Sequence, residues 1–275
     1  MKAICGICPR ACVLEEGGVG FCRARKNSGG TVVDDSYGRL TAMALDPIEK
    51  KPLRRFMSGK MILSVGSYGC NLRCPFCQNS GISMNSGSAA PKSVTTPDEL
   101  ADKASELIPH GNAGVAYTYN EPVIGFEYVR DCEEAVRGRG MVNVLVTNGY
   151  VNEAPLTELL RCTDAMNIDL KAFSERFYGM LGGSLDVVKR NIGIAAGRCH
   201  VEVTTLIIPG ENDGPGEMER QAGWLASIDS NIPLHISRFF PQYKMTNKEP
   251  TPAGDIYRLA DIARGHLNYV YTGNI

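Results

Sequence analysis

Short apolar runs alternate with longer amphipathic stretches along most of the chain, from Met61 to its last residues. The runs have the length of buried strands, whereas the stretches between them have the spacing of amphipathic helices. We therefore predict strands at residues 61–65, 113–118, 142–147, 165–169, 201–208, 234–239 and 269–271. We also predict helices that begin at Pro97 and that cover residues 123–137, 154–161, 185–196, 216–226 and 253–264.

This repeated strand–helix–strand order predicts an α/β fold with a parallel sheet, because helical crossovers join neighbouring parallel strands. The number of such units favours a barrel over an open doubly wound sheet, and we expect a partial (β/α)6-type TIM barrel. The beginning of the chain differs, since it is rich in Cys and Gly and contains only short apolar pieces. We predict a small Cys-rich, metal-binding N-terminal module at residues 1–55 and a core domain at residues 56–275.

Polar clusters follow the predicted strands at the points where these strands end. The clusters lie at residues 70–77, 120–122, 147–149, 169–171 and 209–213. The working loops of such barrels follow the carboxyl ends of the strands, so we expect all five clusters to converge on one mouth. Residues 209–213 are most simply a turn that leads into a helix, and we assign them no catalytic role.

Cys70, Cys74 and Cys77 form a Cys-x3-Cys-x2-Cys run directly after the first predicted strand. A 4Fe-4S cluster usually has four protein thiolates, so a run of three leaves one iron open for a small molecule. An open metal position indicates chemistry rather than scaffolding. A structural zinc site with its fourth ligand elsewhere, or a disulfide pair with a spare thiol, is the alternative interpretation of this run.

A second group of cysteines lies in the N-terminal module and has the spacing Cys-x2-Cys-x3-Cys-x9-Cys, formed by Cys5, Cys8, Cys12 and Cys22. Four thiolates close a metal site completely, which suits structural Zn or an auxiliary iron–sulfur cluster. A cluster there would relay electrons, whereas zinc would replace a hydrophobic core in a segment too short to build one. A metal-free knuckle or a redox pair is the remaining alternative.

The charges of the chain are balanced, with 29 basic and 30 acidic residues and a net charge of −1. This balance gives no global attraction to nucleic acid or membranes, and we predict neither partner. No apolar run approaches the roughly 18 residues that span a bilayer, and the first residues lack the apolar core of a targeting segment. Thiols used as ligands indicate a reducing, cytoplasmic setting.

The remaining cysteines and the histidines carry no ligand pattern. Cys132 continues the apolar spacing of a predicted helix, and we expect it, Cys162 and Cys199 to act as buried hydrophobic residues. No two histidines stand at ligand spacing, so we expect structural roles for His110, His200, His235 and His266.

With the cysteine run and the order of the polar clusters, the chain resembles the radical S-adenosylmethionine (SAM) superfamily, on its branch close to pyruvate formate-lyase activating enzyme. It is most similar to the AmmeMemoRadiSam system radical SAM enzymes. The motifs that carry this resemblance are the cysteine loop and residues 46–53, 117–122, 146–150, 169–173 and 203–210.

The resemblance implies that Cys70, Cys74 and Cys77 bind a 4Fe-4S cluster while SAM chelates the fourth iron. One electron, from a flavodoxin- or ferredoxin-type donor, then cleaves SAM to methionine and a 5'-deoxyadenosyl radical. The radical takes hydrogen from a protein, as a glycyl-radical activating enzyme does, or from a small-molecule substrate. The alternative class of function is an iron–sulfur electron carrier or metal-binding adaptor without SAM cleavage.

The resemblance also implies contacts to SAM. Phe76 would lie against the adenine, and Asn120 and Glu121 occupy the place of a Gly-Gly-Glu-Pro motif that holds the amino group. The two glycines are Tyr119 and Asn120 in this chain. Side chains expected to contact the ribose, the methionine portion or the carboxylate of SAM are Thr147, Asn148 and Lys171.

Each of these residues has a simpler alternative role. Phe76 suits a buried core, Glu121 suits a helix start, and Asn148 with the next glycine suits a turn. Asp169 matches a residue of a monovalent-cation site in activating enzymes, but the second Asp of that site is Val146 here. An ion pair of Asp169 with Lys171 is therefore the alternative.

Overall fold

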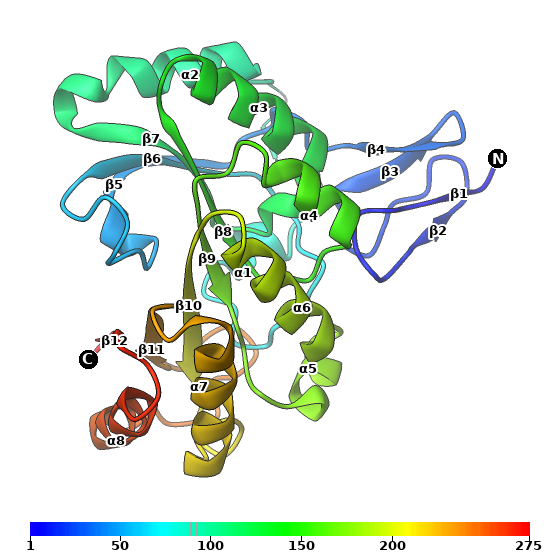
Figure 1. Cartoon of the computed structure of the whole chain (residues 1–275). Coiled ribbons are helices and arrows are strands. Elements are labelled where there is room, and N and C mark those ends of the chain that lie inside the picture. The colour runs from blue at the N-terminus through cyan, green and yellow to red at the C-terminus, as the bar shows by residue number, and fades with distance from the viewer. Residues whose placement is uncertain (89, 92) are drawn as a thin grey trace.

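A curved sheet of eight strands forms the centre of the computed structural model, which describes residues 1–88, 90–91 and 93–275 (Figure 1). The strands lie in the order β12-β11-β10-β9-β8-β7-β6-β5. Neighbours from β6 to β12 pair in parallel, and β5 pairs with β6 in the antiparallel direction. Their bounds are β5 (Ala42–Pro47), β6 (Met61–Gly66), β7 (Asn112–Tyr117), β8 (Val142–Thr147), β9 (Ala165–Asp169), β10 (His200–Ile207), β11 (Leu234–Arg238) and β12 (Val270–Gly273). Because β5 and β12 are edges that do not meet, the predicted α/β partial barrel is confirmed.

The helices follow the strands and pack against one side of the sheet (Figure 1). Their bounds are α1 (Ser80–Ser83), α2 (Pro97–Glu106), α3 (Phe126–Gly138), α4 (Glu153–Leu159), α5 (Glu175–Leu181), α6 (Leu185–Ala196), α7 (Pro215–Asp229) and α8 (Ala253–Arg264), with 3-10 turns η1 (Ile48–Lys50), η2 (Ile108–His110) and η3 (Pro122–Gly125). Helix α2 begins where predicted, because the hydroxyl of Thr96 and the carboxylate of Glu99 form a capping box there. Helix α3 is shorter than predicted, since the chain first makes the turn η3 after Pro122.

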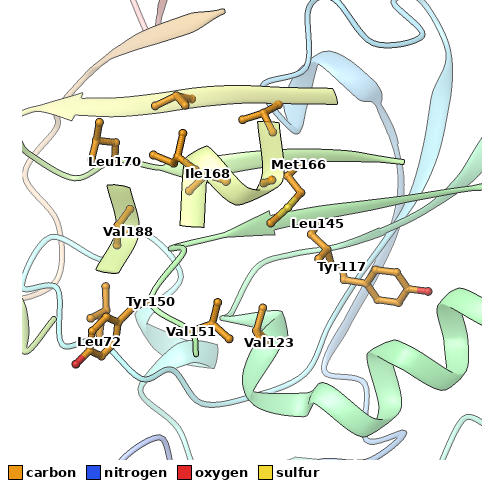
Figure 2. Close-up of a cluster of buried hydrophobic side chains, with 14 of the residues drawn as sticks. Leu72, Tyr117, Val123, Leu145, Tyr150, Val151, Met166, Ile168, Leu170 and Val188 are labelled. Atoms are coloured by element: carbon orange, nitrogen blue, oxygen red, sulfur yellow. The ribbon is translucent and has the colours of Figure 1, made fainter. Parts of the chain in front are cut away.

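The central strands are buried on both faces, as parallel strands covered by helices usually are. Toward the helices, Leu145, Met166 and Ile168 join the large core with Val188 of α6 (Figure 2). Toward the inside of the half-barrel, alternate residues of the same strands form a second cluster with two residues from the segment after β5. This cluster consists of Ile48, Leu53, Ile62, Ala116, Val144 and Ala165.

Residues 48–55, which we call the floor segment, fill the inside of the half-barrel below the strand ends. Buried polar side chains tie this segment to the sheet. Asn167 Nδ2 donates to the carbonyl oxygen of Pro52 at 2.9 Å. The carboxylate of Glu202 accepts the backbone N–H groups of Arg54 at 2.9 Å and Arg55 at 2.7 Å. These bonds satisfy backbone groups that would otherwise be buried without partners.

Glu202 also binds two histidines, and its charge gives the fold a defined dependence on pH. Burial alone would raise the pKa of Glu202, but hydrogen bonds from His200, His235 and the amides of Arg54 and Arg55 lower it to about 2. Because this pKa lies below the unfolded value near 4.5, the carboxylate stabilises the fold above that pH, and the contribution is lost as the pH falls toward 2. We expect Glu202→Gln to lower the free energy of unfolding by about 3 kcal/mol at pH 7 and by much less near pH 3. Urea unfolding at both pH values measures this.

The chain offers a matched control for this prediction. Glu219 makes the same kind of contact with His266 at 2.7 Å, but at the surface. We expect Glu219→Gln to cost less than about 1 kcal/mol at either pH, as exposed ion pairs usually do. An equal loss from Glu202→Gln at pH 7 and pH 3 would contradict the proposed role of the Glu202 charge.

The N-terminal part of the chain forms two small antiparallel hairpins, β1 (Ala3–Ile4) with β2 (Val13–Leu14) and β3 (Arg25–Ser28) with β4 (Thr31–Asp34). Arg25, which is 3% exposed, joins them to α3 through an ion pair of 2.7 Å with Glu127. Strand β5 also lies within residues 1–55 but pairs with the main sheet. The division at residue 55 stays a prediction. None of the helices in the described residues is both long and apolar enough to cross a membrane.

Candidate active site

One cavity of about 570 Å³ opens inside the half-barrel at the carboxyl ends of the central strands. It falls in the range of roughly 300–1,000 Å³ that is common for small-molecule sites. Four of the five polar clusters meet there. The expected site residues that line it are Cys70, Cys74, Phe76, Cys77, Asn120, Glu121, Thr147, Asn148, Asp169 and Lys171.

The fifth cluster, residues 209–213, is not among the described residues that line this cavity, so the expectation that all five converge is wrong for it. The expected turn is present before α7, and Gly210 has the positive φ of 75° that glycine tolerates. Asn212 Oδ1 accepts the N–H of Ile208 at 2.7 Å, and its Nδ2 donates to the carbonyl oxygen of Lys171 at 2.8 Å. The cluster therefore supports the end of β9 from outside the cavity.

The cysteine loop leaves β6 through Gly69, whose φ is 83°. A Cβ at this position would lie 2.3 Å from the carbonyl oxygen of Cys22, so only glycine fits. The sulfur of Cys70 lies 3.6 Å from Nδ2 of Asn148, and the sulfur of Cys77 lies 3.0 Å from the hydroxyl of Ser83. These contacts place polar donors beside the thiols, as is usual around iron–sulfur sulfurs.

The cysteine thiols fit a multi-iron cluster better than a single ion. Burial raises the pKa of the Cys74 thiol to about 11, and burial also raises the pKa of Cys70. Without a metal, the thiols would therefore keep their protons. In the part of the chain that the structure describes, no three Cys, His, Asp or Glu side chains are placed to bind one metal ion. A four-iron cluster does not require the three sulfur atoms to surround one ion, since each thiolate binds a different iron.

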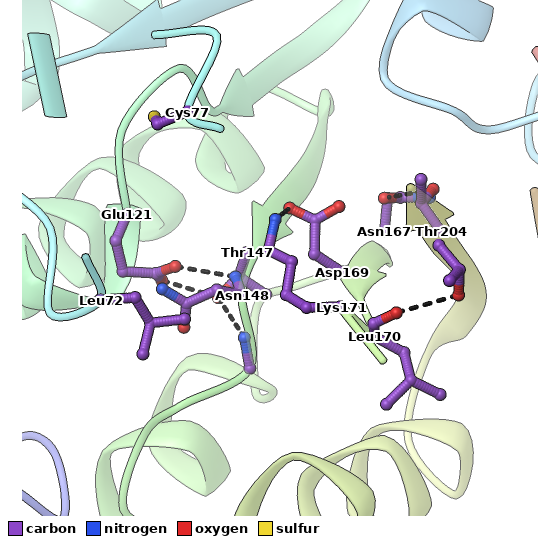
Figure 3. Close-up of polar contacts among 12 residues, drawn as sticks. Leu72, Cys77, Glu121, Thr147, Asn148, Asn167, Asp169, Leu170, Lys171 and Thr204 are labelled. Carbon is purple, nitrogen blue, oxygen red and sulfur yellow. Dashed lines mark hydrogen bonds and ion pairs between the residues drawn. The ribbon is translucent and has the colours of Figure 1, made fainter. Parts of the chain in front are cut away.

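Glu121 lies 3% exposed at the start of η3, where it accepts three hydrogen bonds, and it lies close to Thr147 and Asn148 (Figure 3). Its Oε1 accepts the hydroxyl of Thr147 at 2.6 Å and the N–H of Val123 at 3.1 Å, and its Oε2 accepts the N–H of Asn148 at 2.8 Å. Burial raises the pKa of Glu121 to about 7, although these bonds oppose the shift. A carboxylate has about four acceptor positions, so one position on Oε2 is left for a ligand.

Asn120 holds the cysteine loop in place rather than reaching into the cavity with free atoms. Its Oδ1 accepts the N–H of Ser67 at 2.9 Å, and its Nδ2 donates to the carbonyl oxygens of Tyr68 at 3.2 Å and Gly69 at 3.3 Å. The side chain therefore joins the ends of β6 and β7.

Tyr119, at the place of a glycine in the motif that the chain resembles, has a backbone conformation that favours glycine. Its φ of 69° lies in the left-handed region that favours glycine. The side chain offsets this strain through its partners. The Tyr119 hydroxyl donates to Oδ2 of Asp46 at 3.0 Å, and Nζ of Lys51 lies 2.9 Å from the same oxygen and 4.8 Å from the centre of the Tyr119 ring.

Asp169 and Lys171 form the ion pair that was the alternative to a cation site, with 2.6 Å between Nζ and Oδ2 (Figure 3). Both side chains line the cavity, as their alternation at the end of β9 predicts. Burial alone would lower the pKa of Lys171, but attraction to Asp169 raises it above its usual value, and a deprotonated Cys74 would add to this shift. Lys171 is therefore a permanent cation next to the cysteines.

Phe76 is a core residue at the edge of the cavity, and its contact with the adenine stays a prediction. Its ring is 4% exposed and stacks on Phe177 at 6.0 Å, which makes it part of the core. It also lines the cavity between Cys74 and Cys77.

Sequence reasoning missed further cavity residues on the floor segment and on β10 to β12. These are Lys50, Arg54, Thr204, His235, Ser237 and Tyr271. The signal that could have found two of them is the alternation in β11, where His235 and Ser237 interrupt an apolar strand and therefore share its inner face. The spacing of the histidines predicts a structural role for His235, because it has no second histidine at ligand spacing.

The four N-terminal cysteines line one small, separate cavity, and each of them is a free thiol. Gly20 lies against two of them, since a Cβ there would be 3.7 Å from the sulfur of Cys22 and 3.9 Å from that of Cys12. Burial raises the pKa of Cys8 to about 11 and also raises that of Cys22.

Asn71 connects the two groups of cysteines. It lines the N-terminal cavity, and its Oδ1 accepts Nδ2 of Asn148 at 2.9 Å. The same nitrogen of Asn148 lies 3.6 Å from the sulfur of Cys70. The two thiol groups therefore lie on opposite sides of one short hydrogen-bonded link.

The profile of the Radical SAM superfamily matches residues 64–221, more than half of the chain. The match begins within β6 and ends within α7, so it includes the cysteine loop, Glu121 and Lys171. The chain therefore belongs to the radical SAM superfamily and is an enzyme.

Particular relatives agree with this family. An uncharacterized protein of Methanocaldococcus jannaschii is 37% identical over 277 residues, which cover 100% of this chain and 82% of that protein. Pyruvate formate-lyase 1-activating enzyme of Escherichia coli (strain K12) is 27% identical over 182 residues, 61% of this chain and 71% of that protein. The crystal structure of Streptococcus suis SuiB bound to S-adenosylmethionine has a TM-score of 0.57 and 13% identity, and covers 77% of this chain and 51% of that chain. This last likeness shows the fold.

Proposed function

We propose that this enzyme cleaves SAM reductively, with Cys70, Cys74 and Cys77 holding a 4Fe-4S cluster whose fourth iron is free for SAM. When bound, such a cluster would supply the one electron that converts SAM to methionine and a 5'-deoxyadenosyl radical, which would take a hydrogen atom from the substrate. One observation carries the proposal. The three thiols share a cavity with a carboxylate and a cation, Glu121 and Lys171, which suit the two charged groups of an amino acid.

The chain's own residues divide the work of binding. The free position on Oε2 of Glu121 would accept the SAM ammonium group, and Lys171 would pair with its carboxylate. The ring of Phe76 would lie against the adenine. Thr147 and Asn148 already bind Glu121, Asn71 and the cysteine loop, so they position these groups, and their direct contact with SAM stays a prediction.

The substrate we propose is either a protein, as the activating-enzyme relative supports, or a small molecule, which the size of the cavity supports. The reductant we propose is a flavodoxin- or ferredoxin-type protein, because such carriers supply single electrons at low potential.

Anaerobic reconstitution with iron and sulfide, followed by SAM and dithionite, tests the proposal. We expect deoxyadenosine and methionine in equal amounts. An intact cluster, seen by Mössbauer spectroscopy, without deoxyadenosine would reject SAM cleavage and favour the electron carrier. The buried Glu121 and Lys171 support SAM cleavage over a carrier, since a carrier has no use for a carboxylate and a cation desolvated beside its thiols.

We also propose a second metal centre at the N-terminal cysteines, as either structural Zn or an auxiliary iron–sulfur cluster. The support for a metal here is the shared cavity, the free thiols and the soft donor set. In the described residues no three of these thiols are placed around one ion, which favours the cluster over Zn as it does for the core cysteines. The link through Asn71 would place an auxiliary cluster next to the core cysteines.

A double variant, Cys5→Ala with Cys8→Ala, distinguishes structural Zn from an auxiliary iron–sulfur cluster at this site. Loss of about four irons indicates an auxiliary cluster, and loss of about one zinc indicates a structural site. Metal and sulfide analysis with Mössbauer spectra measures both. A matched double variant, Cys132→Ala with Cys162→Ala, should keep the full metal content. An unchanged metal content in the first variant would contradict a metal at this site.

A further inference from the structure

We propose that the cavity contains an anion subsite, formed by Arg54, His235 and Ser237, that binds the carboxylate or phosphate group of a small-molecule substrate. The inference rests on the proposed function, because it concerns the substrate of that same cavity. The subsite lies on the floor segment and on β11, whereas the cysteine loop follows β6. Strands β7 to β10 separate these two strands in the sheet.

Glu202 brings Arg54 and His235 together. Its Oε2 accepts the backbone N–H of Arg54 at 2.9 Å and Nε2 of His235 at 2.6 Å, so both residues meet at one atom. Glu202 is completely buried and has four donors in total, which fixes the two residues firmly. A residue from the floor segment and a residue from β11 are thereby held next to each other on the cavity wall.

His235 presents an unused nitrogen. The residue is only 7% exposed, and what remains exposed lines the cavity. Its Nε2 is bound to Glu202, which leaves Nδ1 without a hydrogen-bond partner among the residues that the structure describes. The ring stacks on Tyr271, with 5.2 Å between the centroids and 27° between the planes. Because Nε2–H is donated to Glu202, Nδ1 can donate to an anion only as the N–H of the imidazolium ring, so the proposed subsite uses His235 in its doubly protonated form.

Arg54 supplies the positive charge. Its guanidinium takes part in no hydrogen bond or ion pair within the described ranges, although it lines the cavity. Glu49 lines the same cavity, and its Oε1 accepts the N–H of Gly59 at 2.6 Å and the hydroxyl of Ser58 at 2.9 Å, while no hydrogen bond or ion pair among the described residues joins this carboxylate to Arg54. An unpaired guanidinium is the side chain that best recognises carboxylate and phosphate oxygens, because it offers parallel donors.

Ser237 completes the subsite with a hydroxyl on the same face of β11 as His235. The residue opposite it in the sheet is Gly273, where a Cβ would lie 3.2 Å from the Ser237 hydroxyl. Glycine on β12 therefore keeps this hydroxyl accessible. A purely structural role for the pair of Glu202 and His235 would explain how the floor segment is held in place. It would not account for the Arg54 guanidinium, the Ser237 hydroxyl and the Nδ1 atom of His235 on one wall of the cavity.

Calorimetric titration of the reconstituted protein with inorganic phosphate, and separately with sodium acetate, tests the subsite. We expect binding of at least one anion to the wild type, weakened about tenfold or more by Arg54→Gln and by His235→Asn, since each removes a charged or charge-assisted contact. Arg54→Lys should retain part of the affinity, and thermal melts show whether each variant is folded. The control is Arg264→Gln, an exposed ion-paired position on α8, which should bind as the wild type does.

The outcomes separate the sources of the anion. Tighter binding of phosphate indicates a phosphorylated substrate, and tighter binding of acetate indicates a carboxylic acid. No binding of either anion, or equal binding by wild type and folded Arg54→Gln, overturns the subsite and leaves a protein substrate as the better candidate. Because the titration needs neither SAM nor reductant, its failure leaves SAM cleavage standing, and a failure of SAM cleavage leaves the binding result unaffected.

Discussion

Cys74→Ala is expected to abolish deoxyadenosine formation and to reduce the iron bound at the core site. The Cys74 side chain is 8% exposed, stands in the middle of the cysteine loop and lines the same cavity as Phe76 and the Asp169–Lys171 ion pair. Its loss would leave two thiolates for a cluster that needs three to keep one open iron. Iron and sulfide analysis and chromatography of the reaction products measure both effects.

A matched cysteine controls for general damage to the fold. Cys162 follows α4 and lies outside the cavity lining, so Cys162→Ala should retain both the iron and the product. If Cys74→Ala kept wild-type rates, the assignment of the run as the cluster ligands would be wrong. If both variants lost iron equally, the loss would reflect the fold and not the ligand set.

Lys171→Met is expected to weaken SAM binding by about 30- to 100-fold, the usual effect of removing a charge-assisted bond from a buried site. The cation is held 2.6 Å from Asp169, and without it that carboxylate would repel the carboxylate of SAM. Equilibrium dialysis with SAM measures the affinity independently of turnover. Lys171→Arg keeps the charge and should bind more tightly than Lys171→Met.

Lys189 provides the control for this second prediction. Its Nζ lies 4.9 Å from the ring of Phe173 and 5.2 Å from that of Trp224, outside the described lining of the cavity. Lys189→Met should leave SAM affinity within about twofold of the wild type, since distant sites usually act independently. Equal affinities of Lys171→Met and the wild type would contradict the assigned carboxylate contact.

The sheet could be predicted from the sequence because its strands are continuous apolar runs, whose signal is local. The runs at residues 142–147 and 165–169 correspond to β8 and β9 with the same bounds. Strand β5 was missed, since its apolar run covers only residues 42–45 and its residues are half-exposed at an edge of the sheet. Helix α5 was missed because only seven residues separate Ser174 from Gly182, too few for a clear helical period.

The candidate site could be predicted only where its residues stand together in sequence. Cys70, Glu121 and Lys171 each belong to a compact polar cluster at a strand end. Arg54 and His235 do not, because a buried carboxylate far along the chain brings them together. No pattern of neighbouring residues in the sequence indicates that Arg54 and His235 lie next to each other. The positive φ of Tyr119 could not be predicted either, since the residues that contact its side chain lie far away in the sequence, in the segment 46–51.

The bond between Glu202 and the floor segment also sets an order of events during folding. It joins positions 148 residues apart, so the floor segment reaches its final place only after β10 has been synthesised and has paired. Until then the floor segment does not close the bottom of the cavity, and the cysteine loop lies beside an incomplete half-barrel. The chain is synthesised at about 5–20 residues per second, and folding generally begins from the N-terminal side during synthesis. The cysteine loop therefore spends many seconds outside its finished pocket, and stable loading of a cluster belongs after synthesis rather than during it.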